Sequence, residues 1–407
     1  MIKRILSLLL SLSLLLVCLL FVAGCASAGN GARQTVDVTP DPGEATDALD
    51  FAIRLYRAAY DGENTLLSPL SILAALAMTA NGAAGETKSQ MESVLGMTVA
   101  ELNDFFTAYL AALPNDENCK LSLADAIWIR DVPTLVVKDS FLSVNADVYR
   151  AAAYRSPFDG KALDEINGWV KEKTDGMIER ILDDPPMDSL MIILNALAFD
   201  AKWMNPYLQE SEVQPGDFTK ENGDKVRVEF LSDTESRYLS DGDRAVGFVK
   251  PYAGGRYAFA ALLPSKGVAI ADYIATLDGE RIGAILQNIQ YCTVVTRLPK
   301  FETETDLHLN EPLQRLGMTD AFDGDVADFT GISETCALSI SKILHKTYIE
   351  VGEQGTRAAA VTGVFMDYGG FHLDEPKVVT LDRPFVYLIY DVENSLPLFI
   401  GTLNDPS

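Results

Sequence analysis

The sequence contains little histidine and cysteine. Three histidines occur among 407 residues and lie far apart, so we expect no metal site built on several of them. Three cysteines, Cys119, Cys292 and Cys336, remain after the two in the N-terminal segment, and none has a CxxC spacing. This pattern predicts neither a disulfide framework nor a zinc site. We expect free thiols, with at most one disulfide.

Positive charge is also scarce. Lysine and arginine number 33 against 58 acids, for a net charge of -25. Such an excess of acid argues against a nucleic acid as partner and against direct binding to an anionic membrane surface. The chain also lacks a GxSxG motif and a glycine-rich phosphate loop. We therefore expect neither an enzyme nor a bound cofactor.

The chain begins with a hydrophobic segment typical of an N-terminal targeting signal. "MIKR" is basic, "ILSLLLSLSLLLVCLLF" is apolar, and "VAGC" places small residues before Cys25. This order resembles a bacterial lipoprotein signal, so residues 1–24 are predicted to be removed and Cys25 to carry the lipid. The expected location is the outer face of a bacterial membrane, or the medium after release. The alternative is a simple membrane-spanning anchor, since the run approaches the required length.

The next segment differs sharply in composition. Residues 25–46, "CASAGNGARQTVDVTPDPGEAT", are small, polar and rich in proline and glycine, which predicts a flexible tether. Residues 47–407 are then expected to form one large domain, and we expect it to be a monomer.

Helical and strand patterns divide unevenly within this domain. Helices are predicted from Asp47, over the apolar run after Ser68, from Thr87, and over "EINGWVKEKTDGMIERIL". Later segments alternate as strands, interrupted by one helix pattern at "ADYIATLD". This order favours an α+β fold over a regular βαβ series.

One connection is unusually long. About twenty-five residues, "VGEQGTRAAAVTGVFMDYGGFHLDEP", separate two strand patterns at 351–376. Connections above about 12–15 residues without structure of their own tend to be functional or disordered. We therefore expect the activity to reside in this segment.

The domain resembles a serpin over residues 47–407. The resemblance is carried, in the family order, by "NTLLSPLSILAALAMTANGAAGETKSQM", "LNALAFDAKW", "RLPKFETETDLHLNEPLQRLGMTDAFDGDVADFTGI", "LSISKILHKTYIEVGEQGTRAAAVT" and "RPFVYLIYDVENSLPLFIGTLNDP". It implies three sheets, about nine helices and an exposed reactive-centre loop that a protease cleaves. Serpin loop insertion is itself a known instance of strand addition to a sheet.

The residues of the long segment fit such an insertion. A strand from Thr356 would place small or β-branched side chains on one face: Thr356, Ala358, Ala360, Thr362 and Val364. Its other face would carry Arg357, Ala359, Val361, Gly363 and Phe365. Gly355 supplies backbone freedom at the start, and Glu353 matches the acidic residue before the family's hinge. Taken alone, "GTRAAAVT" also fits an alanine-rich helix.

Family spacing implies the bond that a protease would cut. Sixteen positions after Glu353 lies Gly369, so Gly369–Gly370 is the first expectation and Tyr368–Gly369 the second. Counting back from Pro384 points instead to 371–373, because the segment is longer than usual on its C-terminal side. Neither expected bond follows lysine or arginine, which favours elastase-, chymotrypsin- or subtilisin-like targets.

Further residues are assigned by the resemblance. It implies a polar cluster beneath the opening sheet at Ser68, Ser71, Asn195 and His345, with Trp203 where the loop first enters. His345 alone would equally fit a core histidine with satisfied hydrogen bonds. The implied function is a suicide-substrate inhibitor of serine proteases, with cysteine proteases as a second class, that ends in a covalent complex. A serpin-fold binding module without inhibitory activity is the alternative.

Overall fold

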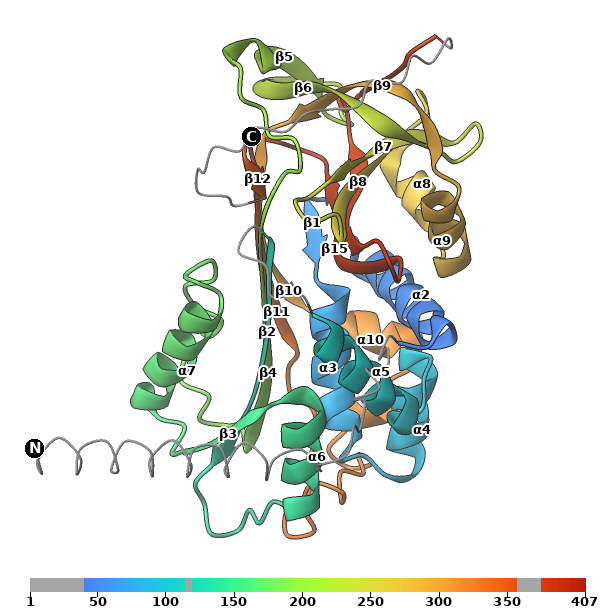
Figure 1. The fold of residues 1–407 in the computed structure, drawn as a ribbon. Coiled ribbons are helices and arrows are strands. Elements are labelled where there is room, and N and C mark those ends of the chain that lie inside the picture. Colours follow the sequence, from blue (N-terminus) through green and yellow to red (C-terminus); the bar gives the residue numbers. More distant parts are fainter. Residues whose placement is uncertain (1–39, 114–118, 357–374) are drawn as a thin grey trace, which may run out of the picture. The chain divides into compact units, whose positions relative to one another are not determined.

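The structure, a computed structural model, describes residues 40–113, 119–356 and 375–407 (Figure 1). The predicted signal, Cys25, most of the tether and the loop residues 357–374 lie outside this described part. The expected reactive bonds and the hinge residues Ala358, Ala359, Ala360 and Thr362 therefore lie outside it as well.

The first described helix begins earlier than the sequence predicts. Helix α2 spans Pro42–Ala59 because the Asp41 side chain accepts from the Gly43 amide, while Glu44 accepts from the Asp41 amide. This arrangement is a capping box, and proline is favoured at the first helical position. Residues 42–46, predicted to belong to the tether, therefore form the first turn of α2.

Three further helices of the first half lie where the sequence predicts helix: α3 Pro69–Ala80, α4 Gly85–Leu95 and α7 Gly160–Lys173. Two others, α5 Val99–Ala112 and α6 Asp139–Tyr149, were not predicted. The prediction for α7 is wrong at its C-terminal end, since residues 174–182 are not helical. Gly176 adopts a φ of 76°, and the Asn167 side chain accepts from the amides of Ile181 and Leu182. These contacts hold the chain in a turn.

The second half contains more helix than the sequence pattern indicated. Besides α8 Ile270–Ala275, which was predicted, the structure contains α9 Gly279–Gln287 and α10 Asn310–Leu316. The Asp278 side chain caps α9 by accepting from the Arg281 amide at 2.8 Å. Both helices are short, so their periodicity is weak. Two 3-10 turns, Glu210–Glu212 and Asp320–Phe322, complete the described helical elements.

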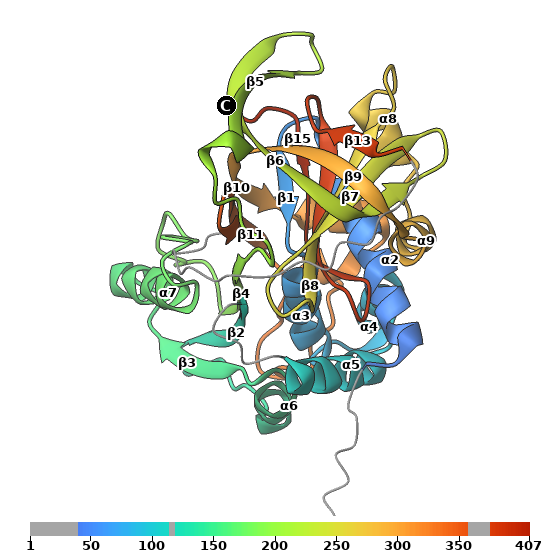
Figure 2. The ribbon, with the colours of Figure 1, turned by 45° about the horizontal axis from the view of Figure 1, so that its top comes forward.

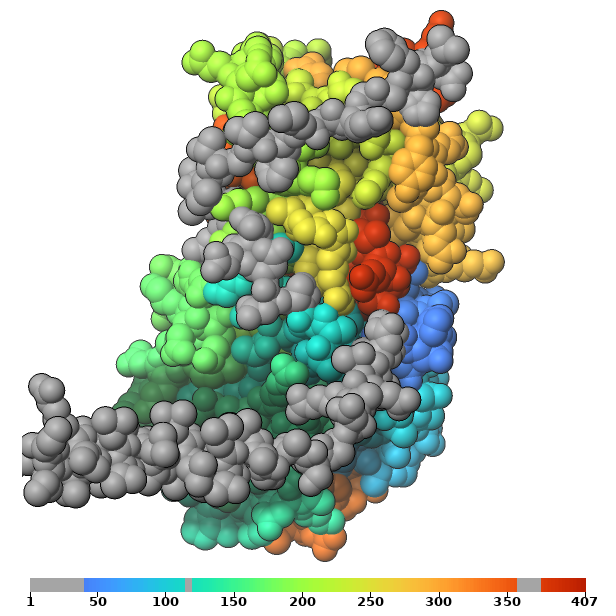
Figure 3. Space-filling model, viewed as in Figure 1, coloured from blue at the N-terminus to red at the C-terminus, as the bar shows by residue number. Residues whose placement is uncertain are grey.

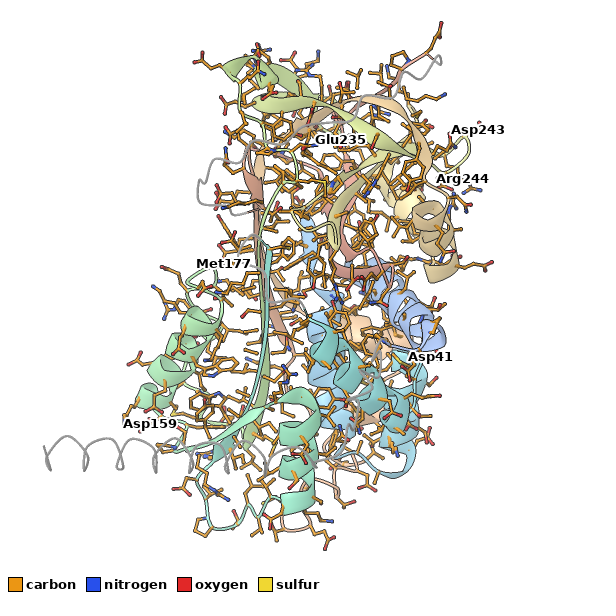
Figure 4. The ribbon with its side chains drawn as sticks, viewed as in Figure 1. Asp41, Asp159, Met177, Glu235, Asp243 and Arg244 are labelled. Atoms are coloured by element: carbon orange, nitrogen blue, oxygen red, sulfur yellow. The ribbon has the colours of Figure 1, made fainter. Side chains whose placement is uncertain are left out.

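A six-stranded sheet runs along the domain between α7 and the other helices of the first half (Figure 1). Its order is β10 Phe301–His308, β11 Leu344–Val351, β12 Gly355–Thr356, β4 Met191–Lys202, β2 Cys119–Arg130 and β3 Ala152–Ser156. Helix α7 lies on one face of this sheet and α3 on the other, as Figures 1 and 2 both show. Asp159, labelled in Figure 4, caps α7 by accepting from the amides of Lys161 and Ala162.

The second sheet has nine strands. Its path is β1 Thr65–Leu67, β15 Leu396–Leu403, β14 Phe385–Asp391, β8 Tyr257–Pro264, β7 Ala245–Pro251, β6 Lys225–Ser240, β9 Gln290–Pro299 and β13 Lys377–Thr380, with β5 Val213–Thr219 paired to β6. Strand β6 pairs with β7 near its end and with β9 along its length, so it joins two strand groups into one hydrogen-bonded sheet. The predicted α+β class is confirmed.

Burial divides the domain into two cores. The larger core lies between the sheets and the helices α2 to α6, while a smaller one, including Trp128, Ile166 and Trp169, lies between α7 and the six-stranded sheet. In the space-filling view, the yellow residues of β8 and the orange residues of α8 and α9 lie above the blue and cyan residues of the first helices (Figure 3). Among the described residues, no helix meets the length and hydropathy needed to cross a membrane.

Candidate functional site

The six-stranded sheet contains a gap between β4 and β11. Within the described residues these strands are joined only through β12, where Val351 pairs with Thr356, and Gly355 and Thr356 pair with Lys202 and Ala201. Strand β12 has only two residues and immediately precedes residues 357–374, the predicted reactive-centre loop. The chain that leads into the loop therefore already occupies one end of the gap.

Gly355 fits this position because it has no side chain. Its φ is +155°, and a Cβ there would lie 2.0 Å from the Ala201 carbonyl oxygen. The turn before it closes through a 3.0 Å hydrogen bond from the Gly352 amide to the Gly355 carbonyl. A larger residue would push β12 away from β4, so glycine is needed here for close backbone approach as well as for conformational freedom.

Thr356 is the first loop residue held inside the sheet. It is buried, and its Oγ1 lies 2.5 Å from the Tyr252 hydroxyl. The Tyr252 ring stacks on Trp203 with centroids 4.5 Å apart. The sequence analysis placed Thr356 on the inward face but gave no role to Tyr252. The role of Tyr252 becomes visible only in the structure, because its partner Thr356 lies far away in the sequence.

Trp203 lies at the same end of the gap, directly after β4. Its indole Nε1 donates to the Gly352 carbonyl at 2.8 Å, and its amide donates to the Gln354 carbonyl at 2.9 Å. The tryptophan therefore holds both sides of the turn that leads into β12.

Glu353 pairs with Lys300, which lies between β9 and β10. Lys300 Nζ lies 2.8 Å from the Glu353 carboxylate and 2.9 Å from Glu229. Partial burial raises the pKa of Glu353, but the hydrogen bond and charge of Lys300 outweigh this, so the net pKa is below its usual range. Both partners remain partly exposed, so the pair contributes modestly to stability.

A buried charge cluster lies behind this turn, and the sequence patterns did not reveal it. Lys250 is 1% exposed and pairs with Asp233 and Glu235, each at 2.7 Å; Glu235 is labelled on β6 in Figure 4. The Lys250 ammonium lies 4.4 Å from the centroid of the Tyr207 ring. The Tyr207 amide in turn donates to the Glu353 carbonyl. Burial lowers the pKa of Lys250, yet these neighbours raise it above its ordinary value overall.

The four residues of the predicted polar cluster lie together farther along the gap. The Ser68 amide donates to His345 Nε2 at 2.9 Å, and the Ser71 hydroxyl donates to Asn195 Oδ1. They line a cavity of about 20 Å³, enough for one water molecule, between residues 195–197 of β4 and 344–347 of β11. Burial lowers the pKa of His345 to about 3, so the imidazole is neutral near pH 7.

Asp125 extends this cluster and was not predicted. Its Oδ1 accepts from Asn195 Nδ2 at 2.7 Å, and it is 5% exposed. A single acid in the otherwise apolar strand "LADAIWI" was the available signal. Trp203 does not join this cluster, because it lies beyond the other end of β4. No group of described side chains offers a metal ligand set.

Comparisons with known proteins agree with this architecture. A family profile described as "Serpin (serine protease inhibitor)" matches residues 46–406. Iripin-2 of Ixodes ricinus is 31% identical over 87% of this chain and 91% of its own length, and bovine (Bos taurus) plasminogen activator inhibitor 1 is 28% identical over 90% and 94%. The native structure of the thermophilic serpin tengpin has a TM-score of 0.83, with 41% identity over 89% of this chain and 94% of its own.

Proposed function

Because the chain belongs to the serpin family, we propose that it inhibits serine proteases as a suicide substrate. A target protease would attack the Gly369–Gly370 bond, or Tyr368–Gly369, and form an acyl ester with the loop. Insertion of the cleaved loop between β4 and β11 would then carry the attached protease across the domain and distort its active site before the ester is hydrolysed.

The observation that carries this proposal is the two-residue strand at one end of the gap. Thr356 pairs with both bordering strands and Gly355 with β4, so residues that follow can extend the same ladder. About ten further ladder hydrogen bonds, at a net ~1 kcal/mol each, would contribute on the order of 10 kcal/mol. This gain is comparable to the whole stability of a typical domain, which is enough to drive a large rearrangement.

The alternative is a binding module with the same fold and no inhibitory activity. Thyroxine-binding globulin shares the fold at 24% identity and a TM-score of 0.78. Such a module would not need small inward side chains in the loop. The run "TRAAAVT" after Gly355 keeps that face free of bulky or charged groups, which favours the inhibitor.

The proposal is tested by incubating the domain with elastase, chymotrypsin and subtilisin. A complex that survives SDS, together with a released C-terminal peptide beginning at Gly370 or Gly369, is the expected result. Mass spectrometry of that peptide identifies the cut bond. Cleavage of the loop with full retention of protease activity, for all three proteases, would refute inhibition.

We also propose that the domain is held at the outer face of a bacterial membrane through a lipid on Cys25. The order of basic, apolar and small residues before Cys25, followed by a polar segment, supports this location. A membrane-held inhibitor would protect the cell's own surface from proteases in its surroundings.

A further inference from the structure

Asp125 is a buried acid with no cationic partner among the residues that the structure describes. It lies on β2 opposite Asn195 of β4, whose amide donates to it at 2.7 Å. Burial raises the pKa of Asp125 to about 7, and the hydrogen bond from Asn195 offsets only part of that rise. An ionised carboxylate in such a place is costly unless water or a cation reaches it. Its protonation therefore depends on how closed its surroundings are.

Helix α3 connects this acid to the gap in the sheet. At its start, the Ser68 amide donates to His345 of β11; one turn later, Ser71 donates to Asn195 of β4. The helix thus bridges the two strands that must separate. A strand inserted between them needs about one strand spacing, roughly 4.8 Å, so opening must stretch at least one of these hydrogen bonds. The same Asn195 side chain accepts from Ser71 through its oxygen and donates to Asp125 through its nitrogen.

The groups around Asp125 leave it as the titrating member near neutral pH. From α6, Tyr149 lies near it, and burial with the charge of Asp125 holds the pKa of that phenol far above neutral. Tyr149 donates to Asn103 of α5, which is uncharged. From α3, Ser71 does not titrate, and across the gap the pKa of His345 is lowered to about 3. No described lysine or arginine shifts the pKa of Asp125.

We propose that Asp125 acts through Asn195 as a positioning residue for loop insertion, and that loss of its proton favours the open sheet. In the closed sheet the carboxyl is 5% exposed, and Asn195, which donates to it, lines the cavity together with Ser68, Ser71 and His345. Opening enlarges this cavity and admits water, which stabilises the ionised form. Since the closed state then binds the proton more tightly than the open state, raising the pH shifts the equilibrium toward opening.

This inference rests on the proposed insertion and can be tested without a protease. The probe is a labelled peptide with the sequence of residues 356–366, "TRAAAVTGVFM", added to the intact full chain between pH 5.5 and 8.5. We expect the rate of peptide uptake to rise as the pH passes through 7. The rise should approach a factor of ten for each unit by which opening of the sheet lowers the pKa of Asp125. The isosteric variant Asp125→Asn should lose this rise, because an amide has no proton to release in that range.

Two further variants separate charge from structure. Ser71→Ala removes the hydrogen bond to Asn195 and should speed uptake at every pH while keeping the rise. The matched control Asp131→Asn changes an exposed acid just beyond β2 and should retain the wild-type profile. Uptake that rises equally in Asp125→Asn would overturn the role of Asp125 and leave insertion intact. No uptake by any variant at any pH would overturn insertion itself, and with it this inference.

Discussion

Gly355 packs so closely against the backbone of β4 that the addition of a single Cβ atom would disturb the pairing of β12 with β4. Two glycines flank the same turn in different surroundings. A Cβ on Gly355 would lie 2.0 Å from the Ala201 carbonyl oxygen, whereas a Cβ on Gly352 would meet no atom of the described residues within 4 Å. The pair therefore offers a direct comparison between a required and a replaceable glycine.

Replacing Gly355 by alanine should lower the free energy of unfolding by about 1–3 kcal/mol, through backbone strain and loss of the β12 pairing. The matched change Gly352→Ala should stay within about 0.5 kcal/mol of wild type. Urea unfolding followed by circular dichroism measures both. Equal effects of the two changes would show that the close approach to Ala201 does not matter.

The buried contact of Thr356 with Tyr252 makes a second residue-scale prediction. Thr356→Arg places a charged side chain where 2% of the residue is exposed, so insertion should stall and the protein should become a substrate. Titration against the protease measures the inhibition stoichiometry, which should rise several-fold. Ala359→Arg, on the predicted outward face, is the matched control and should change it little. An unchanged stoichiometry for Thr356→Arg would disprove the assigned register.

At the scale of elements, helix α3 and strands β4 and β11 form a unit whose stability depends on pH. Burial lowers the pKa of His345 to about 3 from an ordinary value of 6.5. The unfolded chain therefore binds a proton below pH 6.5 that the folded chain resists. Stability contributed by the neutral imidazole is present above pH 6.5 and is lost progressively as the pH falls toward 3.

His345→Gln keeps an acceptor for the Ser68 amide but cannot be protonated. Relative to this variant, wild type should lose up to about 1.4 kcal/mol of unfolding free energy per pH unit below pH 6.5. Unfolding in urea at pH 7.5, 6 and 5 provides the comparison. A constant difference between the two proteins over this range would contradict a neutral buried imidazole.

Elements of strong periodicity were predictable from the sequence, and those set by distant contacts were not. The apolar run of α3 and the amphipathic pattern of α7 are clear in the sequence, whereas α9 and α10 are too short for a clear pattern. The polar cluster came from family resemblance, since no local signal joins Ser68 to His345. Tyr252, Lys250 and Asp125 escaped prediction because their roles depend on partners that lie far along the chain.

For the whole molecule, the proposal requires a native state that is not the most stable one available. Under this proposal, cutting the chain within residues 357–374 should allow the segment after Thr356 to enter the gap. The temperature of thermal unfolding should then rise by roughly 10–20 °C, given about 10 kcal/mol of new hydrogen bonding. Differential scanning calorimetry before and after limited proteolysis measures this shift, and an unaltered temperature would exclude a trapped native state.

Attachment to a membrane is the second prediction for the whole molecule. Cys25→Ala removes the sulfur that would carry the lipid, so the protein should move from the membrane fraction to the soluble fraction of a bacterial host. Fractionation and immunoblotting detect the change, with Cys18→Ala as the matched control expected to remain on the membrane. Retention of the Cys25 variant would instead favour an uncleaved spanning anchor.

The two residues of β12 also bear on the rate of the proposed loop insertion. The costly first step of forming a new strand, closing a turn and aligning its first pairs, is complete before any protease arrives. In the proposed mechanism, only the extension of this strand would remain after cleavage. Inhibition would then depend on whether insertion is faster than attack of water on the ester, and the position of Thr356 inside the sheet would speed insertion without changing the rate of hydrolysis.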